Sequence, residues 1–300
     1  MDTRHAHLIA RARILRAIRA FFDEEGFIEV QTPILVRAPL PEPCIETFSL
    51  TLPDGSKRYL IPSPELHMKP LLAEGFEKVF QITPAFRRDE RGPRHLPEFT
   101  LLEWYRTGAT YRKLMEDCED LVERTAMAVK ETGFVPPLDI SRPFERIPVR
   151  EAFINSAGWD PGPDPDPERF DFDLVTQVEP SLSRTRPVFL YDYPAALASL
   201  ARLKNDDPNV SERVELYLGG IEIANGFTEL VDQDEQSRRF REDLRLRQKR
   251  GLSEYPWPKD FLQALTHMPP CAGMALGIDR LVMVLTGAKV IDDVVSFVEG

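Results

Sequence analysis

The sequence predicts an α+β fold, in which an antiparallel β-sheet is flanked by helices. Strand-like and helix-like runs are both present, but they do not alternate as the βαβ units of a doubly wound parallel sheet. Two strand-like runs, Glu215–Leu218 and Ile221–Phe227, are joined by Gly219-Gly220, which is typical of an antiparallel hairpin. With 300 residues and a 42% hydrophobic composition, the chain can bury a large core.

The first expected element is an amphipathic helix that Gly26 ends. Its apolar residues recur at helical spacing, and its arginines occupy other faces, where we expect them to be solvated. The apolar set is Leu8, Ala12, Leu15, Ile18 and Phe22, and the arginines are Arg11, Arg13, Arg16 and Arg19. A short strand, Phe27–Val30, is predicted to follow.

Three more strands and a second helix are predicted before residue 106. Tyr59–Ile61 is the first of these strands. The helix opens at Ser63-Pro64-Glu65, because serine caps helices and proline suits their first turn, and Gly75 closes it. Val79–Ile82 and Phe99–Tyr105 are predicted as strands on either side of a charged loop.

Helices are predicted over Tyr111–Lys130 and Gln233–Arg250, and the strand Gly273–Gly277 leads into a last helix, Asp279–Leu285. Between Lys130 and Gln233, the residues at about 135–187 include the proline-rich run GWDPGPDPDP and carry no chemical motif. We interpret them as an insertion within a single catalytic domain that covers residues 1–300, and not as a second domain.

The composition excludes several classes of protein. The formal net charge of -11 argues against stable nucleic-acid binding, which needs a basic surface, although a basic protein partner remains open. No run reaches the ~18 apolar residues of a membrane span. Cys44, Cys118 and Cys271 are scattered without a CxxC pair, which disfavours zinc ribbons and disulfide frameworks. We expect reduced thiols in a cytoplasmic protein.

Any binding of ATP must come from side-chain charge, since neither a P-loop nor a dinucleotide motif is present. Arg87 ends an apolar strand, and Arg280 opens a helix in the run GMALGIDR. A guanidinium can bind phosphate oxygens through two parallel hydrogen bonds. A single arginine is more often part of a surface ion pair, but the settings of these two favour a phosphate site. His95, in the charged loop, is expected to be structural and not catalytic.

Glu215 and Glu222 stand on the two arms of the predicted hairpin. Carboxylate oxygens on neighbouring strands can share a Mg²⁺ ion that also binds triphosphate oxygens. Two solvent-facing strand positions are the alternative, and the apolar neighbours Ile221, Ile223 and Phe227 weigh against it.

A third set combines carboxylates with two polar side chains: Glu65, Glu103, Glu229, Tyr105 and Asn225. Carboxylates in an enclosed pocket need partners, and a substrate with two ammonium groups would supply them. Glu103 and Tyr105 point the same way on one strand. Strict alternation places Asn225 and Glu229 on the face opposite Glu222, so a common site requires a bulge or a helical turn near Gly226.

These segments resemble the motifs of class II aminoacyl-tRNA synthetases, and most closely those of the lysyl branch. TPIL near Pro33 resembles motif 1, which forms the dimer interface in that class, while FRRDERGPRHLPEFTLLEWY resembles motif 2 and GMALGIDRLVM resembles motif 3. SPELHMK, VFQI and GIEIANGFTEL also have counterparts in lysyl-tRNA synthetases. The first catalytic-type helix begins close to Met1, so we expect no anticodon-binding OB domain. With EWY, ANGF and ALGIDR, the chain resembles the elongation factor P lysine ligases, stand-alone paralogues that attach (R)-β-lysine to a lysine of elongation factor P.

This resemblance extends the candidate sets to individual positions. ATP contacts are implied for Arg87, Arg88, Asp89, Leu96, Glu222, Ile223, Gly277 and Arg280, of which Arg87 and Arg280 are the candidate catalytic residues, at the α- and γ-phosphates. Substrate contacts are implied for Ser63, Pro64, Glu65, Glu103, Tyr105, Asn225, Glu229 and Ala275, with Mg²⁺ at Glu215 and Glu222. Ala275 stands where lysyl-tRNA synthetases usually have glycine, and its methyl group would suit a lysine isomer with a displaced amino group.

The expected function is an ATP-dependent, AMP-forming ligase that activates (R)-β-lysine as its adenylate and transfers it to elongation factor P. We expect ATP and Mg²⁺ as cofactors, β-lysine or lysine as the small substrate, elongation factor P as the partner, a homodimer and a cytoplasmic location. One alternative is a truncated lysyl-tRNA synthetase acting on tRNA, which the missing OB domain and the acidic charge disfavour. The other is a non-catalytic synthetase-like regulatory subunit, which would have no need of the phosphate-binding arginines.

Overall fold

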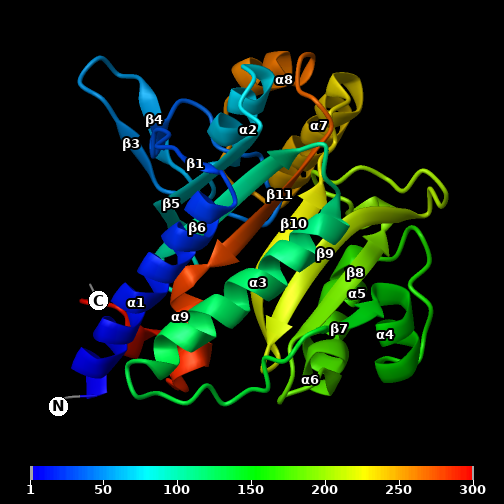
Figure 1. The fold of residues 1–300 in the computed structure, drawn as a ribbon. Helices are drawn as coiled ribbons and strands as arrows, with labels where there is room; N and C mark the ends of the chain where they lie inside the picture. Colours follow the sequence, from blue (N-terminus) through cyan, green and yellow to red (C-terminus); the bar gives the residue numbers. More distant parts are fainter. Residues whose placement is uncertain (1–2, 299–300) are drawn as a thin grey trace.

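A computed structural model describes residues 3–298, and one large sheet runs through the middle of the molecule (Figure 1). Its strands pair in the order β1-β5-β6-β11-β10-β9-β8-β7. The edge pairs β1–β5 and β7–β8 are parallel, and the pairs between them are antiparallel. The predicted α+β class with an antiparallel sheet is confirmed. The strands span Ile28–Glu29 (β1), Lys78–Phe86 (β5), Glu98–Thr107 (β6), Glu145–Pro148 (β7), Val188–Pro194 (β8), Val210–Leu218 (β9), Ile221–Thr228 (β10) and Cys271–Gly277 (β11).

Helices α1 (Thr3–Glu24), α3 (Tyr111–Lys130) and α9 (Ile278–Thr286) lie along one face of this sheet (Figure 1). The largest apolar cluster fills the space between these helices and the strands. Ile18, Leu121 and Leu281, one from each helix, are fully buried in it. The opposite face of β6, β10 and β11 is left free of this helical layer, and the cavity described below lies there.

The predicted N-terminal helix forms, but its buried face differs in part from the prediction. Ala10, Ile14 and Ile18 face the core, whereas Ala12 is exposed. The prediction that all four arginines are solvated is wrong for Arg11. Its guanidinium pairs with the buried carboxylate of Asp279 and donates to Thr100 Oγ1 at 2.7 Å, which ties α1 to the start of α9.

Helices α2 (Glu65–Ala73), α7 (Gln233–Lys249) and α8 (Lys259–Leu265) gather at the end of the sheet drawn uppermost in Figure 1. Met68, Phe240 and Phe261 bring these helices together in a second apolar cluster that also contains Tyr105 of β6. A small separate sheet, ordered β2-β4-β3, stands beside them. Its strands are Leu35–Val36 (β2), Ser49–Thr51 (β3) and Lys57–Leu60 (β4).

The residues that follow α3 contribute the β7 edge and a group of short helices. Val149, Phe153, Phe170 and Val188 form a cluster of their own between these helices and β8. The interpretation of residues 135–187 as an insertion within one domain stays a prediction. The helical segments are α4 (Val149–Ser156), α5 (Pro167–Asp173), the π-helical η1 (Leu174–Val178) and α6 (Glu179–Ser181), and later single turns are η2 (Ala195–Leu197) and η3 (Ile291–Val294).

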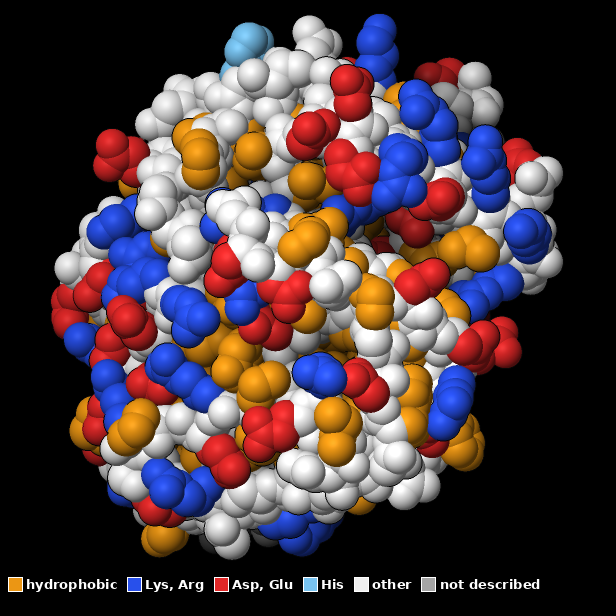
Figure 2. All heavy atoms as spheres, turned by 90° about the vertical axis from the view of Figure 1, so that its right-hand side faces the viewer, with side chains coloured by type: hydrophobic (Ala, Val, Ile, Leu, Met, Phe, Trp, Pro, Cys, Tyr) orange, Lys and Arg blue, Asp and Glu red, His pale blue; other side chains and the backbone are white. Residues whose placement is uncertain are grey.

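Over the described residues, no helix is both long and apolar enough to cross a membrane. Basic and acidic side chains are interspersed over the face of the molecule drawn in Figure 2. This face therefore offers no continuous basic surface of the kind that binds a nucleic-acid backbone.

Candidate active site

The register of the central strands brings the predicted site residues into one row. Ala275 of β11 pairs with Glu103 of β6 on one side and with Asn225 of β10 on the other. Glu215 of β9 pairs with Asn225, which extends the row to a fourth strand. Side chains in one row of a sheet share a face. The pairing therefore gathers four residues that are far apart in the sequence.

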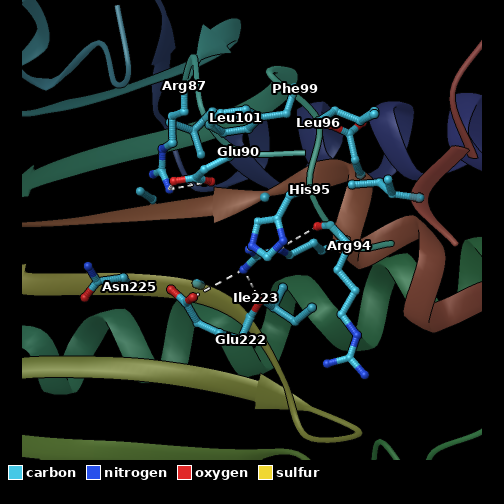
Figure 3. A pocket seen from close by; sticks show the side chains of 16 residues that line it. Arg87, Glu90, Arg94, His95, Leu96, Phe99, Leu101, Glu222, Ile223 and Asn225 are labelled. Atoms are coloured by element: carbon cyan, nitrogen blue, oxygen red, sulfur yellow. Dashed lines mark hydrogen bonds and ion pairs between the residues drawn. The ribbon is translucent and has the colours of Figure 1, made fainter. Parts of the chain in front are cut away.

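A cavity with two connected chambers lies against this row. The first chamber is drawn in Figure 3, and its lining includes Arg87, Arg94, His95, Leu96, Phe99, Ile223, Gly277 and Arg280. The second, of about 280 Å³, is lined by residues including Glu42, Ser63, Glu65, Glu103, Tyr105, Arg213, Phe227, Glu229 and Gly273. Arg87, Leu101, Glu222, Asn225 and Ala275 line both chambers. A molecule in one chamber can thus contact a molecule in the other.

Arg87, labelled in Figure 3, and Arg280 both line the first chamber. The Arg87 guanidinium lies over the ring of Phe99, 5.1 Å from its centroid, and pairs with Glu90 at 3.3 Å. Its buried Nε has no hydrogen-bond partner among the described residues. Arg87 therefore has donors to offer to a bound anion.

Arg280 is held at the end of β11 by contacts on three sides. Its Nη1 donates to the backbone oxygen of Glu222 at 2.9 Å and lies 3.2 Å from Glu222 Oε2. Its Nη2 lies 2.5 Å from His95 Nε2, and Nε donates to the backbone oxygen of Arg94. Burial and the Arg280 charge lower the pKa of His95, so the ring is neutral and accepts from the guanidinium. This supports the structural role predicted for His95.

A bulge in β10 places Glu222 with the other site residues. Glu222 pairs with Tyr217 of β9 and Ala224 pairs with Leu216, so one extra residue, Ile223, is inserted in the strand. The extra residue reverses the alternation, and Glu222 joins Asn225 in the cavity wall. The predicted bulge exists, but the position near Gly226 was wrong, because the pairing from Ala224 to Phe227 is regular.

Glu215 and Glu222, the predicted magnesium ligands, lie close enough to influence each other. Burial, and then the charge of Glu215, raises the pKa of Glu222. Burial and both of these carboxylates raise the pKa of Glu179 to about 7. Glu215 itself accepts from Arg213 at 2.6 Å and from Tyr217 at 2.7 Å, and it lines neither chamber.

The neighbouring carboxylates Glu179, Glu215 and Glu222 give this region an excess of negative charge, which would suit a divalent cation. Within residues 3–298, however, no three His, Cys, Asp or Glu side chains are arranged to hold a metal ion. The chain itself therefore offers the two carboxylates Glu215 and Glu222, and the oxygens of a triphosphate would have to complete the coordination.

The prediction that Glu65 and Glu229 depend on the substrate for a cation is wrong. Lys69 of α2, which is 1% exposed, lies between them. Its Nζ is 2.9 Å from Glu65 Oε2 and 2.7 Å from Glu229 Oε2. Burial raises the pKa of Glu229 to about 7 even though Lys69 lowers it. The two glutamates are therefore already bridged, and each retains one oxygen for a ligand.

Glu103 lines the second chamber and is 1% exposed. Ser63 Oγ is 2.6 Å from its Oε1, and Tyr105 OH is 2.8 Å from its Oε2. Burial, followed by the charge of Glu65, raises the pKa of Glu103 to about 8. An ammonium group bound here would favour the ionised form, which is the usual effect of a nearby positive charge.

Gly273 makes room for this arrangement. A Cβ atom at Gly273 would lie 2.1 Å from the ring of Tyr105 and 2.8 Å from Glu229 Oε1. Both side chains can approach the β11 backbone only because this residue has no side chain.

Besides Glu215, three of the predicted residues do not line either chamber. Arg88 and Asp89 lie on the surface and pair with each other at 3.0 Å, and Pro64 is buried beside Ser63 and Glu65. Sequence reasoning missed Lys69, Glu42 and Arg213. Only Lys69 had a local signal, because it stands four residues after Glu65 on the same helix.

The comparisons with known proteins agree with this geometry. The model of a family described as tRNA synthetases class II (D, K and N) matches residues 2–299. A protein of Yersinia enterocolitica named elongation factor P–(R)-β-lysine ligase is 40% identical over 314 aligned residues, covering 98% of this chain and 95% of that protein. Proteins of the same name are 39% identical in Pectobacterium atrosepticum and 40% identical in Histophilus somni strain 2336, each covering 97% of this chain and 94% of its own length.

Proposed function

This chain belongs to the class II tRNA synthetase family, and from that premise we propose that it is an ATP-dependent ligase for elongation factor P. It activates (R)-β-lysine as an adenylate and transfers it to a lysine side chain of that protein. The relatives named above carry this activity in their names and share about two residues in five with this chain over nearly its whole length.

The observation that carries the proposal is the joined cavity. One chamber presents Arg87 and Arg280, which suit phosphate groups, and the other presents Glu65, Glu103 and Glu229, which suit ammonium groups. Both chambers share the wall around Ala275. ATP in the first chamber and a diamino acid in the second would bring a carboxylate next to a phosphate.

In the proposed first step, the substrate carboxylate oxygen attacks the α-phosphorus of ATP, and pyrophosphate leaves. Arg87 binds the α-phosphate, and Arg280 binds the γ-phosphate. Glu222 and Glu215 would hold Mg²⁺, which would neutralise part of the triphosphate charge. Holding the two reactants together is the main contribution, since orientation can supply about 7–11 kcal/mol.

The second step transfers the acyl group. The amine of the acceptor lysine, in its deprotonated form, attacks the acyl carbon of the adenylate, the bond to the phosphate oxygen breaks, and AMP leaves. The proton lost by the amine passes to solvent. We assign no side chain of this chain as the base.

The amino-acid chamber selects a diamine. Glu103, Tyr105 and Glu229 line it and receive the distal ammonium, while Ala275 lines both chambers. A monocarboxylate with one ammonium group would leave part of this negative charge without a partner. An acidic amino acid would be repelled.

We also propose that the chain forms a homodimer through the surface around β1 to β4. Ile28, Ile34, Leu35, Phe48 and Leu50 are large apolar side chains exposed there. Exposed apolar groups in one region mark association surfaces. Light scattering after size exclusion should give twice the chain mass of 34.3 kDa, and a mass equal to one chain would contradict the dimer.

Pyrophosphate exchange with purified protein tests the first step. The proposal predicts exchange that depends on ATP, Mg²⁺ and (R)-β-lysine. Absence of exchange with both β-lysine and α-lysine would exclude the ligase and favour a regulatory subunit. Transfer of labelled amino acid to tRNA, and not to elongation factor P, would instead identify a tRNA-charging enzyme.

A further inference from the structure

Glu42, to which the sequence analysis gave no role, lines the second chamber. It belongs to the segment between β2 and β3, and it faces Ser199, Arg213 and Glu65 across the cavity. The segment is not a free loop at this point. The buried guanidinium of Arg247 donates to the backbone oxygens of Glu42 at 2.5 Å and of Ile45 at 2.7 Å.

Further contacts make the position of Glu42 well defined. Arg247 also pairs with the buried carboxylate of Glu46, and its guanidinium stacks on the ring of Tyr255 at 3.8 Å. Glu46 in turn accepts from the backbone nitrogen and hydroxyl of Ser253. An arginine that is 1% exposed thus fixes the backbone that carries Glu42 into the cavity.

Glu42 and Glu103 differ from the other carboxylates of the second chamber because neither is paired with a basic side chain. Lys69 pairs with Glu65 and Glu229, Arg280 pairs with Glu222, and Glu103 is bonded to two hydroxyl groups. Among residues 3–298, no basic side chain lies within ion-pairing distance of the Glu42 carboxylate. Burial, and then the charge of Glu65, raises its pKa, while Arg213 and Arg87 lower it from farther away.

The neighbours of Glu42 also place it along the length of a bound amino acid. Tyr105 and Glu229 lie at Gly273, which lines only the second chamber, whereas Glu42 is within electrostatic reach of Arg87, which lines both chambers. The Arg87 end is where the carboxylate of the substrate must meet ATP. An amino group near that carboxylate would therefore come close to Glu42.

We propose that Glu42 binds the ammonium group of the substrate that lies nearer its carboxylate. In this arrangement Glu65, held by Lys69, orients the amino acid, and Glu42 supplies the charge that pairs with this amine. The inference rests on the proposed function, because it assumes a diamino acid in the second chamber. It assigns a specificity-determining residue that the motifs do not contain.

The test compares the wild type with Glu42→Gln, Glu42→Asp and the control Cys44→Ser in pyrophosphate exchange. Cys44 is an exposed residue of the same segment. The KM for (R)-β-lysine should rise about tenfold or more in Glu42→Gln, because a hydrogen bond between charged groups is lost. Glu42→Asp should recover part of this loss. The KM for ATP should stay within about twofold of the wild-type value in all variants, because Glu42 does not line the first chamber, where ATP is proposed to bind.

A second ligand distinguishes the loss of a specific contact with one amine from general damage to the folded variant. ε-Aminocaproate retains the carboxylate and the distal ammonium but lacks the other amine. Its inhibition constant should be the same for wild type and Glu42→Gln. An unchanged KM for (R)-β-lysine in Glu42→Gln, or an equal loss for both ligands, would overturn the role of Glu42 and leave the ligase in place. Absence of exchange in the wild type would instead remove the proposed function, and the inference with it.

Discussion

Replacing Lys69 with methionine removes the one cation that bridges two buried glutamates. The Lys69 ammonium is 2.7 Å from Glu229 and 2.9 Å from Glu65, and all three side chains are at least nine-tenths buried. Methionine has a similar length and fills the space without the charge. The variant therefore tests the electrostatic contribution of Lys69 with little change in packing.

The expected effect follows from leaving two carboxylates buried without a counter-charge. Removing one partner from a buried ion pair costs about 3–5 kcal/mol. For a chain of this size, that corresponds to a fall in Tm on the order of 10 °C. Exposed Lys130 on α3 serves as the control, because its replacement by methionine should change stability by less than about 0.5 kcal/mol.

The stability of the protein should depend on pH, because the pKa of Glu229 differs between the folded and unfolded states. The pKa of Glu229 is about 7 in the folded protein, against an ordinary value of 4.5 for a glutamate in an unfolded chain. The folded state therefore binds a proton at Glu229 more tightly than the unfolded state does. This group therefore destabilises the fold increasingly as pH rises from about 4.5 to about 7. Without Lys69 the folded pKa rises further, and the loss of stability becomes larger and extends to higher pH.

Thermal unfolding of wild type, Lys69→Met and Lys130→Met at pH 5 and pH 8 measures this difference. We expect Lys69→Met to be much less stable than wild type at pH 8 and closer to it at pH 5, where Glu229, whose pKa burial raises to about 7, takes up a proton. Equal Tm values for wild type and Lys69→Met at pH 8 would refute the bridging role. A deficit of the same size at both pH values would show that packing, and not charge, is responsible.

Three further variants test the cavity itself. Arg87→Lys should lower the pyrophosphate exchange rate about a hundredfold at unchanged Tm, because an ammonium cannot make the paired hydrogen bonds of a guanidinium; full activity would exclude Arg87 from the phosphate site. Gly273→Ala should weaken (R)-β-lysine binding about tenfold or more in calorimetry, since its methyl group would displace Tyr105, and undiminished affinity would contradict that contact. Ala275→Gly should shift the ratio of kcat/KM values toward α-lysine, and an unchanged ratio would remove the specificity role of its methyl group.

The parts of the fold that were predictable are those with local signals. Tyr111–Lys130 was predicted to the residue, because its apolar spacing starts after Thr110 and stops near Gly133. The β9–β10 hairpin was predictable because Gly219 and Gly220 both adopt positive φ, which their sequence already favours. That Arg87 and Arg280 line one chamber agrees with the motifs around them, and their phosphate-binding roles stay predictions.

The features that escaped the sequence depend on contacts between distant segments. Arg11 pairs with Asp279, which is 268 residues away, and Arg247 fixes the backbone of Glu42, which is 205 residues away. The bulge at Ile223 leaves no mark in the apolar pattern, so strict alternation gave the wrong face for Glu222. Lys69 was missed because its pairing with Glu229, which follows β10, forms only when α2 packs against β6 of the folded sheet.

Intact-mass spectrometry of elongation factor P tests directly whether this chain is its lysine ligase. The acceptor is incubated with this protein, ATP, Mg²⁺ and (R)-β-lysine, and in parallel with the ligase of Yersinia enterocolitica as a positive control. We expect the mass of the acceptor to increase by one lysyl residue, and an acceptor without its target lysine to be unchanged. An acceptor that the control enzyme modifies but this protein leaves at its original mass would exclude the ligase activity.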